Sequence, residues 1–157
     1  MNRPSSTYDN HNSIDAARRF IYSHVATEGA PPTAKELALH FDTEPEDAVE
    51  VLKVLGVTKR VILNPESGEI WMCGPFSAVP TRFRVHGATA SWWANCAWDM
   101  LGIPASLNIS ATLETQCACC NEPVRIEVDA ERGPLSREGL VHIFVPARRW
   151  YDDIGFT

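Results

Sequence analysis

The stretch RVILNPESGEIWMC, residues 60–73, predicts a β-hairpin. Val61 and Leu63 alternate with less apolar neighbours before the segment NPESG, and Ile70 and Met72 do so after it. Alternating apolar residues on both sides of a cluster of Asn, Pro, Ser and Gly are typical of two antiparallel strands joined by a turn. The elements expected before and after this hairpin then define the fold.

Three helices are expected before the hairpin. The first begins at Ile14 after a capping Ser13 and ends at EGAPPT. The second is AKELALHF, preceded by Thr33, which forms a capping box with Glu36. The third lies within DTEPEDAVEVLKVLGV, residues 42–57. The positions predicted to face the core are Ala17, Phe20, Ile21 and Val25 in the first helix and Ala48, Val49, Leu52 and Leu55 in the third.

Three helices followed by a hairpin is the order of a winged helix, so a DNA-binding regulator is one hypothesis. The charge of the third helix argues against DNA binding, because residues 44–53 include four acidic residues and one basic residue. The acidic residues are Glu44, Glu46, Asp47 and Glu50, and the basic residue is Lys53. DNA phosphates repel such a surface. The net charge of −6 for the whole chain also disfavours nucleic acid and anionic membranes as partners. We therefore expect a docking or structural role for this module.

The composition predicts a soluble protein of the cytoplasm. No apolar run approaches the ~18 residues of a membrane span, and the start MNRPSSTYDNHNS lacks the apolar core of a secretion signal. The 157 residues suit one domain or two small ones, and 45% of them are hydrophobic. The chain has five cysteines. An odd number in a reducing compartment favours thiol or metal chemistry over disulfides.

The second half is predicted to be a small antiparallel sheet with one buried helix. TRFRV (81–85), SLNISATLET (106–115), VRIEVDA (124–130) and GLVHIFVP (139–146) are strand candidates, and ASWWANCAWDMLGIP (90–104) is expected to be helical. The fold class is therefore α+β, with a winged-helix-like module of three helices and a hairpin followed by a mainly antiparallel sheet. The expected division is a flexible N-terminus (1–12), the winged-helix-like module (13–75) and the second module (76–157).

The tryptophan-rich segment contains one thiol and one carboxylate, Cys96 and Asp99. Residues three apart share a face of a helix, so the two groups can act on the same bound atom. Burying a carboxylate among tryptophans is costly and raises its pKa, which suits a group that holds and delivers a proton. The alternative is that Cys96 is a small buried hydrophobe and Asp99 makes a local hydrogen bond.

A second thiol cluster lies in QCACCNEP, where Cys117, Cys119 and Cys120 fall within four residues on a turn between strands. Thiolates are soft ligands that prefer Zn²⁺, Cu⁺ or similar ions. A structural zinc site needs four ligands, usually as two pairs, and Cys73 alone makes no second pair. Two interpretations stay open: a metal contact, or a turn held by one buried cysteine with two incidental thiols.

The order of PTRFRV, WWANCAWDMLGIPA, a strand and the C-x-C-C turn resembles the alkylmercury lyase family. The resemblance runs from about residue 14 to the C-terminus, and NCAWDMLGIPA is its most specific part. It implies that Cys96 is the first catalytic cysteine, Asp99 the catalytic aspartate and Cys117 a structural cysteine. The implied reaction is protonolysis of a carbon–mercury bond, in which the Cys96 thiolate captures mercury and Asp99 shuttles the proton to carbon.

The resemblance also implies the partners of the site. No organic cofactor is required, and mercury enters as part of the substrate and leaves as the product ion. A small organometallic substrate and thiol donors are the expected partners, whereas nucleic acid and membrane are not. The side chains of Trp92, Trp93 and Trp98 are expected to hold an apolar organic group and to exclude water.

One family feature is absent from the sequence. The family has a second catalytic cysteine, expected just after a segment resembling RRWYDDIGFT, yet no cysteine follows Cys120. Either the sequence lacks the C-terminal portion of the catalytic module or this member lacks that thiol. In the second case Cys119 or Cys120 replaces it only if their turn folds back toward Cys96. A non-catalytic, thiol-based binder of Hg, Cu or Zn on the same scaffold is the alternative function.

Overall fold

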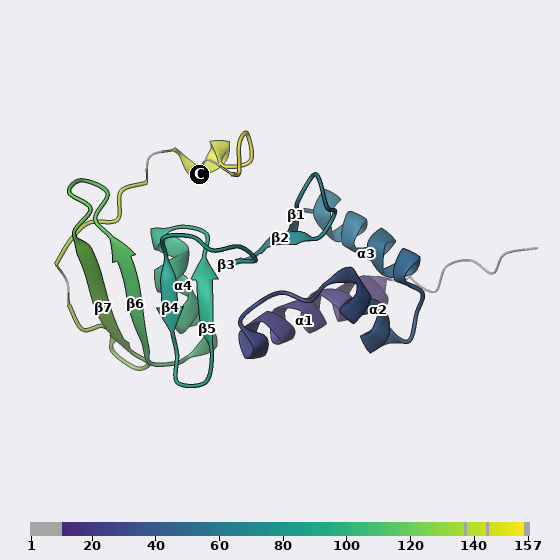
Figure 1. Ribbon diagram of the computed structural model, residues 1–157, viewed down its shortest axis with the longest axis horizontal. Coiled ribbons are helices and arrows are strands. Elements are labelled where there is room, and N and C mark those ends of the chain that lie inside the picture. Colours follow the sequence, from purple (N-terminus) through teal and green to yellow (C-terminus); the bar gives the residue numbers. More distant parts are fainter. Residues whose placement is uncertain (1–10, 137, 144, 156–157) are drawn as a thin grey trace, which may run out of the picture.

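A computed structural model of the protein describes residues 11–136, 138–143 and 145–155. Three helices and the first hairpin of the sheet lie at one end of the molecule, and later strands of the sheet lie with a fourth helix at the other (Figure 1). The predicted flexible N-terminus, apart from residues 11 and 12, falls outside the described residues. The helices are α1 (His11–Glu28), α2 (Ala34–Phe41), α3 (Pro45–Val57) and α4 (Ala97–Leu107).

The capping box predicted for α2 is confirmed. The Glu36 N–H donates to Thr33 Oγ1 at 3.2 Å, and the Thr33 N–H donates to Glu36 Oε2 at 2.7 Å. These two bonds satisfy backbone donors that a helix start leaves without partners. The predicted start of α1 at Ile14 is wrong, because the helix begins at His11 and Ser13 lies within its first turn.

The predicted inward face of α3 is correct at all but one position. Ala48, Leu52 and Leu55 are buried, but Val49 is 37% exposed, and Val51 is buried in its place. In a helix of 3.6 residues per turn, position 51 lies near positions 48 and 55, whereas position 49 is rotated by about 100° from position 48. The buried residues of α3 are therefore spaced as the geometry of a helix requires, and the prediction that Val49 faces the core is wrong.

All eight strands form one antiparallel sheet, which confirms the α+β class. The predicted hairpin is present, since Ile62 pairs with Met72 and Leu63 with Ile70. The order is β1-β2-β3-β5-β4-β6-β7-β8. The strands are β1 (Ile62–Leu63), β2 (Ile70–Cys73), β3 (Phe76–Ser77), β4 (Arg84–His86), β5 (Ser91–Ala94), β6 (Ala111–Gln116), β7 (Pro123–Asp129) and β8 (Gly133–Pro134).

The sheet crosses the predicted boundary between the two modules. β2 belongs to the hairpin of the first module, and it pairs with β3 of the second through Cys73 and Phe76. A second link is made by Trp92 on β5, whose indole N–H donates to the Val25 carbonyl of α1 at 2.8 Å. The winged-helix interpretation and the division at residue 75 stay predictions, but the two halves share a sheet.

The helix predicted over residues 90–104 is wrong at both ends. Its first part is strand β5, in which Trp92 pairs with Val85 of β4, and α4 begins only at Ala97. Side chains alternate across a strand, so Trp92 is 2% exposed while its neighbour Trp93 points away from the core. The helix also continues through Pro104 to Leu107, because Ile103 and Pro104 are buried against the sheet.

Two strand predictions in the second half also need correction. The strand expected over residues 106–115 begins at Ala111, since Leu107 ends α4 and Asn108 adopts the left-handed conformation of a helix C-cap. The described residues of the segment GLVHIFVP form no strand, and Leu140 is fully exposed. Its apolar side chains gave a strand-like pattern, but no neighbouring strand pairs with them in the described structure. No helix among the described residues has both the length and the apolarity needed to cross a membrane.

Cys73 lies in the core, where burial raises the pKa of its thiol to about 12. The unfolded chain exposes this thiol, whose ordinary pKa is 9.0. The folded protein therefore keeps the thiol protonated, and its full stability is present below pH 9 and is lost as the pH rises from 9 toward 12. At pH 10 the expected loss is about 1 kcal/mol.

We therefore expect the free energy of unfolding of the wild type to fall more steeply between pH 8 and 10 than that of Cys73→Ala. Urea denaturation at each pH measures this difference. The alanine variant will be less stable throughout because it leaves a cavity, so the slope against pH is the informative quantity. Equal slopes for the two proteins would show that the Cys73 thiol does not contribute to the pH dependence of the free energy of unfolding.

Candidate functional site

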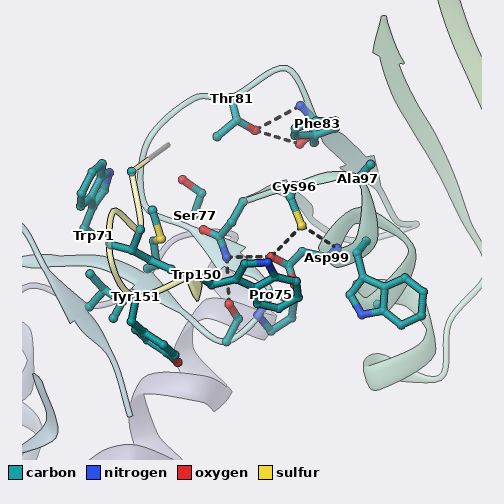
Figure 2. A pocket seen from close by; sticks show the side chains of 18 of the residues that line it. Trp71, Pro75, Ser77, Thr81, Phe83, Cys96, Ala97, Asp99, Trp150 and Tyr151 are labelled. Carbon is teal, nitrogen blue, oxygen red and sulfur yellow. Dashed lines mark hydrogen bonds between the residues drawn. The ribbon is translucent and has the colours of Figure 1, made fainter. Parts of the chain in front are cut away.

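Cys96 and Asp99 lie side by side at the start of α4. Cys96 is the N-cap residue, and its Sγ accepts the backbone N–H of Asp99 at 3.4 Å. The Cys96 thiol in turn donates to Asp99 Oδ2, also at 3.4 Å (Figure 2). An N-cap side chain reaches back to the third helical residue, so the start of the helix brings the thiol and the carboxyl together.

Burial determines the protonation of this pair. It raises the pKa of the Cys96 thiol, and the nearby negative charge of Asp99 raises it further, although the Asp99 backbone N–H acts in the opposite direction. Burial also raises the pKa of the Asp99 carboxyl, against hydrogen bonds from Cys96 and Asn95 that favour its ionised form. Both groups resist ionisation together, so the pair is suited to sharing and passing one proton.

Asn95 positions the carboxyl, and the sequence analysis missed this residue. Its Nδ2 donates to Asp99 Oδ2 at 3.3 Å and to the Gly74 carbonyl at 2.8 Å. Its Oδ1 is buried and has no hydrogen-bond partner in the described part of the chain. The only signal in the sequence was its position directly before Cys96, which does not reveal that the amide turns toward Asp99.

The pair opens into a cavity of about 950 Å³. Three separate segments line it, within residues 59–83, 95–106 and 141–155, together with Tyr22 of α1. Figure 2 shows Cys96 and Asp99 with aromatic side chains of the lining around them. The aromatic residues that line the cavity are Tyr22, Trp71, Phe83, Trp98, Trp150 and Tyr151.

Of the three tryptophans expected at the substrate pocket, one lies at the cavity and two do not. Trp98 lines the cavity, but Trp92 and Trp93 do not. Trp92 is buried beneath the sheet, and Trp93 lies under the Arg84 guanidinium, 4.1 Å from its ring centroid. The strand conformation of β5 explains this, because it turns these two side chains to opposite faces of the sheet.

One wall of the cavity comes from the described residues of 141–155, here called the C-terminal strap. The Trp150 indole N–H donates to the Val145 carbonyl at 2.7 Å, and Lys59 Nζ lies 4.0 Å from the centre of the Tyr151 ring. A Cβ atom added at Gly155 would come within 2.9 Å of the Trp71 ring. The strap therefore packs against the predicted winged-helix-like module.

The turn that carries Cys117, Cys119 and Cys120 does not reach the cavity. None of the three lines it, so the described structure does not meet the condition under which Cys119 or Cys120 would replace the second catalytic thiol. Cys119 and Cys120 are exposed, and backbone N–H groups of both residues lower the pKa of the Cys117 thiol. Over the described residues, no three His, Cys, Asp or Glu side chains are grouped closely enough to hold a metal ion.

Comparisons with known proteins identify the family and a similar fold. A family model described as MerB, alkylmercury lyase, matches residues 76–155. Among solved structures, one titled "Crystal structure of the mercury-bound form of MerB2" is similar with a TM-score of 0.60 and 18% sequence identity. The match covers 81% of this chain and 60% of that chain, and at this identity it concerns the fold. The search of curated proteins returned no match.

Proposed function

Because this chain belongs to the alkylmercury lyase family, we propose that it cleaves the carbon–mercury bond of organomercurials by protonolysis. Cys96 and Asp99 are the proposed catalytic residues. The observation that carries the proposal is a thiol and a carboxyl within 3.4 Å of each other, both facing one cavity. A soft sulfur that binds mercury and an acid that delivers a proton are the two groups that this reaction needs.

In the first step the Cys96 thiol gives its proton to Asp99 Oδ2, to which it is already hydrogen-bonded. Its sulfur then forms a bond to mercury, and the anionic ligand of the organomercurial leaves. The organic group and mercury are now held on Cys96. The raised pKa of Asp99 keeps the transferred proton on the carboxyl rather than losing it to water.

In the second step Asp99 delivers this proton to the carbon bound to mercury. The electron pair of the carbon–mercury bond forms the new carbon–hydrogen bond, so the hydrocarbon leaves and Hg²⁺ stays on sulfur without any change in oxidation state. The organic group would lie against the aromatic side chains of Trp98, Trp150 and Tyr151, which line the cavity.

A thiol donor in solution completes the turnover by removing Hg²⁺ from Cys96. Cys96 is the one thiol among the described lining residues, so a second thiol must come from outside this cavity. The lining includes Lys59, Arg60 and Arg82, whose positive charges attract anionic thiols.

Phenylmercury with excess small thiol tests the proposal. We expect the protein to release one benzene per phenylmercury, and in D₂O this benzene should carry one deuterium, because the proton comes from exchangeable groups on Cys96 and Asp99. Gas chromatography with mass spectrometry measures both. Protein that retains phenylmercury without releasing benzene would instead be a non-catalytic mercury binder.

A further inference from the structure

The turn between β6 and β7 brings two thiols together on the surface. The Cys117 N–H donates to the Glu122 carbonyl and the Asn121 N–H to the Cys117 carbonyl, both at 2.9 Å. Asn121 closes the turn in the left-handed conformation, with φ at 58°. Cys117 and Cys120 are thus the first and fourth residues of a five-residue turn that is closed between Cys117 and Asn121.

The contacts around these sulfurs separate Cys117 and Cys120 from Cys119. The backbone N–H groups of Cys119 and Cys120 and the Cys120 side chain lie near enough to the Cys117 sulfur to lower the pKa of its thiol. The Cys120 thiol lies 3.5 Å from Glu122 Oε2, a carboxylate that can accept its proton. Cys119 contributes its backbone N–H to the turn, and its side chain is exposed. Two of the three thiols are therefore arranged as a pair.

We propose that Cys117 and Cys120 form a second metal site, separate from the cavity, that binds one soft d¹⁰ cation such as Hg²⁺ in linear coordination. Two thiolates on opposite sides satisfy Hg²⁺, whereas Zn²⁺ needs four ligands. Over the described residues, no group of three or more His, Cys, Asp or Glu side chains is placed to hold a metal ion, which favours a two-coordinate cation over Zn²⁺. This site goes beyond the proposed cleavage and does not depend on it.

The chemistry of capture needs no oxidant or reductant. Two sulfur–mercury bonds form, two thiol protons pass to solvent or to Glu122, and mercury remains divalent. Since the turn is exposed, it can accept Hg²⁺ delivered by small thiols in solution.

The test uses HgCl₂ and protein in which Cys96→Ser removes the cavity thiol. In the presence of a competing monothiol, native mass spectrometry should show one retained Hg²⁺ per chain, with the ultraviolet absorption of a mercury dithiolate. Adding Cys117→Ser or Cys120→Ser should weaken this binding by ~10²-fold or more, because a chelate becomes a single ligand. Cys119→Ser is the matched control and should leave the affinity unchanged.

Equal losses in all three serine variants, or no loss with Cys117→Ser, would overturn the site. So would Zn²⁺ binding as tightly as Hg²⁺, since that requires further ligands. Circular dichroism checks that each variant is folded, which is expected because the substituted side chains lie on an exposed turn. This test measures Hg²⁺ binding in a variant that lacks Cys96, whereas the benzene assay measures cleavage. Failure of the proposed metal site can therefore be distinguished from failure of the proposed reaction.

Discussion

Cys96→Ser is expected to lower the release of benzene from phenylmercury by ~10³-fold or more. Serine differs from cysteine in one atom, but its oxygen is a hard ligand with little affinity for mercury, and its hydroxyl does not ionise near neutral pH. The first step of the proposed reaction is then lost, while the cavity keeps its shape. Initial rates with phenylmercury and a small thiol measure the effect.

The same substitution should leave the fold intact. Cys96 is the N-cap of α4, and serine is among the preferred residues at this position. We therefore expect the free energy of unfolding to change by less than about 1 kcal/mol. Cys119→Ser removes an exposed thiol outside the cavity and should keep the wild-type rate. Equal rates for the wild type and Cys96→Ser would refute the catalytic role of this thiol.

Asp99→Asn is expected to lower the rate by about 10²–10⁴-fold, the usual contribution of a positioned acid or base. Asparagine has nearly the same shape but cannot take the proton from Cys96 or deliver it to carbon. Mercury capture should then persist without cleavage, with the Cys96 proton passing to solvent instead of to Asp99. Mass spectrometry should detect a phenylmercury adduct on the variant, whereas the wild type in the presence of thiol should lose the phenyl group.

The pH profile gives an independent test of Asp99. The carboxyl must be ionised to accept the Cys96 proton, so the rate should fall as the pH drops through the pKa of Asp99. Burial raises this pKa above its ordinary value of 3.8, so the acid limb should be centred above pH 3.8. The limb should be absent in Asp99→Asn.

Asp47→Asn is the matched control for this profile, because Asp47 is an acidic residue in the first turn of α3 and does not line the cavity. It should keep the wild-type rate and the wild-type acid limb. An acid limb that persists in Asp99→Asn would assign the titration to another group.

Local signals in the sequence were sufficient for several elements. The hairpin, the capping box at Thr33 and most of the α3 core face depend on residues close together in the chain. The closeness of Cys96 and Asp99 was also predictable, although for a different reason. The prediction placed both residues within a helix, whereas the structure makes Cys96 the cap and Asp99 its partner in the first turn. Both arrangements bring residues three apart together.

Features that depend on tertiary contacts were not predictable in the same way. The run of Trp92 and Trp93 fits either a helix or a strand, and pairing of β5 with β4 and β3 determines the outcome. The cavity wall combines Trp71 with Trp150 and Tyr151, which lie about half the chain away. No local pattern connects such distant residues, and the apolar strap sequence resembled a strand.

The continuous sheet has a consequence for how this protein and its relatives can diverge. Cys96 and Asp99 lie within the region matched by the family model, but Tyr22, Lys59 and Trp71 of the same cavity precede it. Substitutions in that earlier region can reshape what the cavity admits without touching the reacting pair. Part of the cavity wall is therefore encoded outside the stretch that carries Cys96 and Asp99, and that part can change while the pair is conserved.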